Sequence, residues 1–226
     1  MAKPMFDADA LISAFENANA QQGAQLKKAV SDATLASLQG RELTLKNIRA
    51  ALKAVTEAAS AGAAKNLTGG VDAEALLDQA VAGMDQALLK AVEANRVALG
   101  QLVSQGADLR EKHLKKALDD LDKFEDTMFA AIRKAAAGVE GPMAGAWNQV
   151  LEKMQAGGTL SGAKASTTVE QLAAQMQDAM RTSRAASMRA AQAMAESYTA
   201  MVSGVLLGMS DALQSGAAAR KTPAKK

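Results

Sequence analysis

The residues that could carry chemistry are few, and none has the spacing of a catalytic site. His113 is the only histidine, and its neighbours include the charged Arg110 and Lys112. A single histidine cannot build a histidine-based zinc site, and no serine or cysteine is placed to form a nucleophile pair with it. We therefore expect His113 to be an exposed surface residue.

Carboxylates and glycines offer no better candidate. Asp119, Asp120 and Asp122 alternate with lysines at helical spacing, which is typical of a solvated face with i,i+4 ion pairs. Gly69-Gly70 lacks the Lys-Ser/Thr that follows a phosphate-binding loop, and no strand pattern precedes it. Cysteine is absent, which excludes disulfides and thiolate metal sites. The sequence thus predicts a protein that is not an enzyme and that binds neither a metal nor a cofactor.

The composition favours long helices over a thick globular core. Hydrophobic residues make up 49% of the 226 residues and aromatic residues only 3%, because alanine supplies much of the hydrophobic content. Alanine favours helix but buries little area. The net charge of +2 argues against a generally basic nucleic-acid binder. The uncharged run from Ser197 to Ser210 is shorter than the about 20 residues of a membrane span, so we expect a cytoplasmic protein that is not transmembrane.

Two stretches organise the chain, each with mostly apolar residues at successive steps of four, three and four, a pattern that repeats after eleven residues. The first, 71–137, contains no proline, and we predict that it forms one long, nearly straight helix. Eleven residues in three turns is about 3.67 residues per turn, so the stripe stays on one face of an α-helix. The positions of this stripe are Leu77, Val81, Met84, Leu88, Val92, Asn95, Leu99, Val103, Gly106, Arg110, Leu114, Ala117, Leu121, Glu125, Met128 and Ile132.

The second stretch, 168–214, follows the same rule and predicts a long C-terminal helix that lies antiparallel to the first. Methionines are frequent along its stripe, and both an ordinary core and an adaptable binding surface are compatible with them. Gly204 and Gly208 form a small-xxx-small pair, which predicts a tight helix–helix crossing. The stripe consists of Val169, Leu172, Met176, Met180, Ser183, Ser187, Ala191, Met194, Tyr198, Val202, Val205, Met209 and Leu213.

Shorter helices are predicted in residues 1–68, ahead of the first long stretch. Asp7 or Asp9 can cap the first of them and Thr44 the third, because their side-chain oxygens can accept amide hydrogen bonds of a first turn. Asp72 then begins the long helix. Together, the short and long helices predict an all-α, elongated helical bundle.

A hinge at 138–167 separates the two long helices. Pro142 can be the first residue of a short helix in it, and the glycine-rich residues 156–167 predict a flexible loop. Thr167 and Thr168 each fit a capping box at the start of the last helix.

The tail, 215–226, is rich in alanine and lysine and is predicted to be disordered. A solubilising role and a weak, salt-sensitive contact with DNA or another polyanion are both compatible with its cations. These cations are Arg220, Lys221, Lys225 and Lys226.

The eleven-residue period in long, alanine-rich helices resembles that of proteins that coat hydrophobic particles, such as apolipoproteins, perilipins and synucleins. A cysteine-free, aromatic-poor chain that ends in AAARKTPAKK more closely resembles bacterial phasins, which cover polyhydroxyalkanoate storage granules. The resemblance extends over most of the chain and lies in composition and period. It implies a non-enzymatic protein associated with a granule in the cytoplasm.

Two functions remain open on the sequence. In the first, the stripes hide against one another in water and open onto a hydrophobic granule or lipid surface. In the second, the protein is a structural bundle or homo-oligomer whose stripes always face protein partners. The residues predicted to touch a hydrophobic surface are Leu88, Val92, Leu99, Val103, Met194, Val202, Val205 and Met209.

Overall fold

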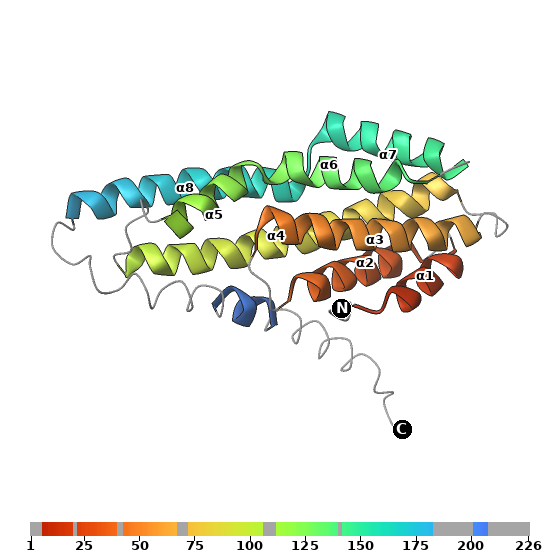
Figure 1. The fold of residues 1–226 in the computed structure, drawn as a ribbon, viewed down its shortest axis with the longest axis horizontal. Coiled ribbons are helices and arrows are strands. Elements are labelled where there is room, and N and C mark those ends of the chain that lie inside the picture. Colours follow the sequence, from red (N-terminus) through yellow and green to blue (C-terminus); the bar gives the residue numbers. More distant parts are fainter. Residues whose placement is uncertain are drawn as a thin grey trace, which may run out of the picture.

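The computed structural model describes residues 6–19, 22–39, 43–66, 72–105, 112–139, 142–182 and 201–207. Within these ranges the regular elements are helices and no strand occurs, which confirms the all-α prediction. The helices lie roughly along one long axis (Figure 1). They are α1 (Ala8–Glu16), α2 (Gly23–Leu38), α3 (Leu45–Asn66), α4 (Ala73–Ser104), α5 (Lys112–Asp122), α6 (Phe124–Ala136), α7 (Pro142–Gly157) and α8 (Leu160–Thr182), and residues 201–207 are also helical.

Local side chains set several helix starts, as predicted. An aspartate or threonine oxygen accepts an amide hydrogen bond at the start of α1, α3 and α4. The acceptors are Asp7, Thr44 and Asp72, at 3.0, 3.3 and 3.1 Å from the amide nitrogens of Ala10, Asn47 and Glu74. The helix α7 begins at Pro142, where a residue without an amide hydrogen fits the unpaired first turn.

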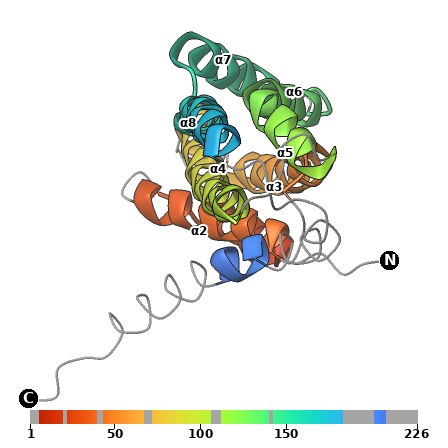
Figure 2. The ribbon, with the colours of Figure 1, turned by 90° about the vertical axis from the view of Figure 1, so that its left-hand side faces the viewer.

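Several helices pack directly around α4. It contacts α2, α3, α7 and α8, and the apolar residues of its predicted stripe from Leu77 to Val103 are all buried. Gly83 brings α4 close to α2, because a Cβ at this position would lie 2.5 Å from the carbonyl oxygen of Lys27. In Figure 2, α4 lies between α2 and α8, with α3, α5 and α6 to one side. The eleven-residue stripe is therefore the inner face of the bundle.

The structure has three helices where the sequence predicted one over 71–137. The first of them, α4, ends at Ser104, α5 begins at Lys112, and a turn separates α5 from α6. The stripe itself gives the physical reason, since Gly106 and Arg110 interrupt its apolar residues. A continued helix would place no large apolar side chain on the stripe there, whereas α5 and α6 pack against α8, and α6 also packs against α3.

The last long helix runs parallel to α4, not antiparallel as predicted. Asp85 of α4 contacts Ser161 in the first turn of α8, and Glu93, further along α4, contacts Lys164. The chain reverses once after α4 and again after α6, so α7 and α8 follow one another in the direction of α4 (Figure 1). Two reversals cancel, which is why a single predicted hinge gave the wrong direction.

The helix α8 also begins earlier than predicted, inside the expected loop 156–167. Only Gly158 and Thr159 separate it from α7, and Gly158 has a φ of +67°, which L residues rarely adopt. The hydroxyls of Thr167 and Thr168, predicted as caps, instead bond to carbonyl oxygens one turn back within the helix, at 3.0 and 2.8 Å.

Candidate functional site

The predicted surface-binding residues of α4 lie in the protein core. Leu88 and Val92 are 0% exposed, Leu99 is 1% and Val103 is 6% exposed. The structure therefore places this stripe against protein, as in the closed form that the sequence predicts in water. Any contact with an external surface requires a neighbouring helix to move.

The segment 201–207 carries two of the described residues of the C-terminal stripe, and α8 carries two others, Val169 and Leu172. Val202 is buried and Val205 is half-buried against the same core, and both views place the segment beside the bundle on the side of α2 (Figures 1 and 2). Gly204 is exposed, and a Cβ there would meet no atom within 4 Å, so the predicted close helix contact is not made at this residue. Met194, Gly208, Met209 and the tail cations Arg220, Lys221, Lys225 and Lys226 lie outside the described residues.

Mostly small and polar side chains of α8 face the bundle. Among the described side chains of α8, over 160–175, Leu172 is the one large apolar residue that is fully buried. The others that are buried are Ser161, Gly162, Ala165 and Thr168. Because alanine, glycine, serine and threonine bury little apolar area, the part of α8 over 160–175 covers α4 with few large apolar side chains.

Two carboxylates from other helices hold the first turn of α8. Asp85 on α4 accepts the amide hydrogens of Leu160 and Ser161, at 3.0 and 2.9 Å. Glu125 on α6 accepts both the amide and the hydroxyl hydrogen of Thr159, each at 2.9 Å. These carboxylates satisfy amides that have no partner inside the helix, and their charge complements the positive end of its dipole.

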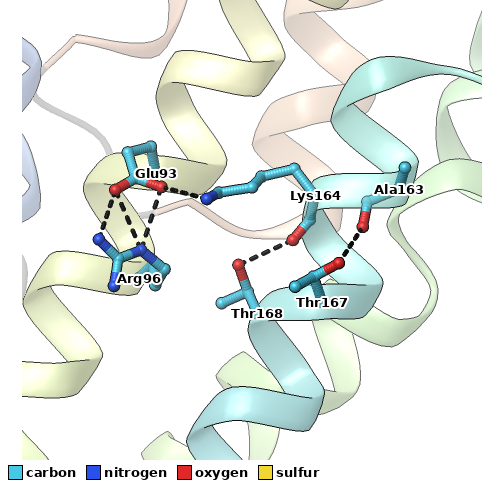
Figure 3. Close-up of polar contacts among 6 residues, drawn as sticks. All are labelled: Glu93, Arg96, Ala163, Lys164, Thr167 and Thr168. Atoms are coloured by element: carbon cyan, nitrogen blue, oxygen red, sulfur yellow. Dashed lines mark hydrogen bonds and ion pairs between the residues drawn. The ribbon is translucent and has the colours of Figure 1, made fainter.

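A third carboxylate holds α8 one turn further on. Lys164 Nζ lies 3.0 Å from Glu93 Oε2 on α4 (Figure 3). Arg96 Nε lies 3.0 Å from each oxygen of the same carboxylate. The hydrogen bond from Arg96 is the main cause that lowers the pKa of Glu93 to about 2; burial opposes it, and Lys164 contributes a smaller lowering. Glu93 thus has one partner on its own helix, Arg96, and one on α8, Lys164.

We call Asp85, Glu93 and Glu125 the α8 latch. The sequence prediction did not single out any of these residues for a function. Glu125 does carry a sequence signal, because it falls on the predicted stripe, and a polar residue on a buried face needs a partner. Asp85 and Glu93 flank the stripe and have no such signal, since their partners on α8 lie far along the chain.

The other predicted chemistry can be placed only in part. Lys116 and Asp120 form an i,i+4 ion pair at 2.7 Å, which confirms that prediction for α5. The side chain of His113 lies outside the described part of the structure. Within the described ranges, no three His, Cys, Asp or Glu side chains gather in a group that could hold a metal ion, and no helix combines the length and apolar composition of a membrane span.

A family model matches residues 1–215, which include all eight named helices and the α8 latch. The chain belongs to the Family of unknown function (DUF6781). The match to this family ends before the four cations of the tail. No curated protein and no solved structure matches the chain.

Proposed function

We propose that this member of the DUF6781 family is a non-enzymatic, phasin-like coat protein of the cytoplasm. In this proposal α8 swings away from α4, and the uncovered stripe lies on a hydrophobic granule or lipid surface. The observation that carries the proposal is the mismatch between the two helices. The stripe of α4 is apolar except for Asn95, whereas most of the buried side chains of α8 over 160–175 are small or polar.

The energetics favour α8 as the moving element. Burial contributes about 25 cal/mol per Å² of apolar surface, so a cover with few large apolar residues holds weakly through this effect. The polar contacts of α8 exchange with water on opening, which leaves a net loss of only about 1 kcal/mol for each neutral hydrogen bond. Separating α4 from α2 would instead expose Leu26, Val30 and other buried apolar residues.

A hydrophobic surface would take the place of α8 over the stripe of α4. Leu88 and Val92 lie on α4 between Asp85 and Glu93, the two residues that bind α8. When α8 leaves, a hydrophobic surface can bury these side chains again, so opening and coating become one coupled step. Each molecule would then gain only a small binding free energy, so stable coating would depend on many molecules.

The alternative is a structural bundle, alone or as a homo-oligomer, in which α8 never opens. The complete burial of the α4 stripe inside one chain is the observation in its favour. The two functions differ in whether the bound form requires α8 to leave α4.

A disulfide across the α8 latch distinguishes them. The natural chain has no cysteine, so Asp85→Cys/Ser161→Cys can form only one intramolecular disulfide. The two residues are in contact, since Ser161 N lies 2.9 Å from Asp85 Oδ1. The natural protein, the oxidised variant and the reduced variant would each be mixed with polyester or lipid particles and separated by flotation.

We expect the natural and reduced proteins to float with the particles and the oxidised protein to stay behind. The reduced variant is the matched control, because it carries both substitutions without the bond, and thiol titration verifies closure. Equal flotation of the oxidised and reduced forms would refute opening. Absence of the natural protein from the particles would favour the structural bundle.

A further inference from the structure

The contacts that hold α8 also determine the charge of the face beneath it. Each member of the α8 latch is a carboxylate on α4 or α6, and only one of its partners on α8 is a cation, Lys164. The other partners are backbone amides and the hydroxyl of Thr159. When α8 leaves, the amides, the hydroxyl and the cation leave with it, and the three carboxylates remain.

The uncovered face would therefore be acidic at its edge. Of the groups that touch these carboxylates, Arg96 alone belongs to α4, so the edge would hold three negative charges and one positive charge. The other charged residues of α4 are Lys90 and the pair Glu74 and Asp78, and Lys153 of α7 is ion-paired with both of these carboxylates.

Helices that bind anionic lipids have the opposite arrangement, with lysine and arginine beside the apolar face. An acidic edge is repelled by anionic headgroups, whereas at an uncharged surface the carboxylates can stay in water while the stripe is buried. From these charges, and resting on the proposed coating function, we propose that the α4 face selects an uncharged apolar surface and discriminates against an anionic lipid surface.

The test compares two droplets that differ only in charge. One is a triolein droplet coated with phosphatidylcholine, and the other has about 30 mol% of that lipid replaced by phosphatidylglycerol. Full-length protein with Arg220, Lys221, Lys225 and Lys226 all changed to Gln removes attraction by the tail. Since one charge near such a surface changes binding by about fivefold, we expect the neutral droplets to bind this protein at least about fivefold more tightly.

Two further substitutions in the tail variant separate surface charge from helix release. Glu125→Gln removes one edge charge and loosens α8, so it should strengthen binding to both droplets and lower the neutral-to-anionic ratio. Lys164→Gln loosens α8 but leaves every edge carboxylate in place, so it should strengthen binding to both droplets and leave the ratio unchanged.

Equal or tighter binding to the anionic droplets by the tail variant would overturn the charge selectivity and leave the coating function standing. A neutral-to-anionic binding ratio that stays the same in Glu125→Gln would also overturn it, because the edge carboxylate would then have no effect on binding to a charged surface. Failure to bind either droplet, with the fold intact, would instead refute the coating function.

Discussion

Asp85→Ala should release α8 while the rest of the bundle stays folded. Asp85 accepts two amide hydrogen bonds, and a hydrogen bond to a charged group contributes about 1.5–3 kcal/mol. Ser161 is 0% exposed, so its amide would lose its partner without gaining water. Leu160 is 69% exposed, so water can replace much of the second bond. We therefore expect a loss of about 2–4 kcal/mol in the free energy that holds α8 closed.

Hydrogen exchange measures this opening directly. A change of about 3 kcal/mol corresponds to an increase of about two orders of magnitude in the exchange of amides that are protected by closure. The increase should be confined to α8, over 160–175, while the amides of α2 and α3 keep their protection.

Asp72→Ala is the matched control for Asp85→Ala. It removes the same side chain from the exposed start of α4, where Asp72 Oδ1 accepts one amide bond at 3.1 Å. An exposed cap of this kind contributes about 1 kcal/mol. Exchange in α8 that rises no more in Asp85→Ala than in Asp72→Ala, or that rises equally in α2, would refute the assignment of Asp85 as the main restraint on α8.

Four further substitutions test the bundle. The pKa of Glu93 is about 2 against an ordinary 4.5, so its ion pairs stabilise the fold fully above pH 4.5 and are lost as the pH falls toward 2. In urea unfolding, the free energy of unfolding of Glu93→Gln should therefore fall less than that of the natural protein between pH 4.5 and pH 2. Gly83→Ala should destabilise by about 1–3 kcal/mol, because its Cβ would press on α2, whereas Gly100→Ala, with no atom within 4 Å, should stabilise by up to about 1 kcal/mol in thermal unfolding. Val103→Asp should lower the unfolding free energy by about 3 kcal/mol through a buried, unpaired charge, and an unchanged value would show that Val103 is not in the core.

The sequence best predicted the features that depend on residues close together in the chain, namely helix faces and helix starts. The eleven-residue period located the buried face of α4, since apolar spacing and helical geometry fix a face together. Asp7, Thr44, Asp72 and Pro142 located helix starts, because a cap acts within one turn of its own position.

The prediction failed where contacts between residues far apart in the sequence determine the structure. The start of α8 depends on Asp85 and Glu125, which lie 76 and 34 residues before the amides of Ser161 and Thr159 that they bind. A glycine-rich stretch with no local cap resembles a loop until these acceptors are known. Gly162 in the first turn also depends on a distant residue, because a Cβ there would overlap the carboxyl group of Glu125 and displace it.

The position of these acceptors also bears on synthesis. A ribosome completes α4 and α6 before it reaches Thr159, and protein chains generally begin to fold from the N-terminal side. The carboxylates that position α8 are thus in place before α8 exists. Until α8 emerges from the exit tunnel, the stripe of α4 has no cover from it. If the proposed coating function holds, a nascent chain that meets a hydrophobic surface in this interval would bind it without the cost of releasing α8, and coating would be most efficient where translation takes place beside the surface.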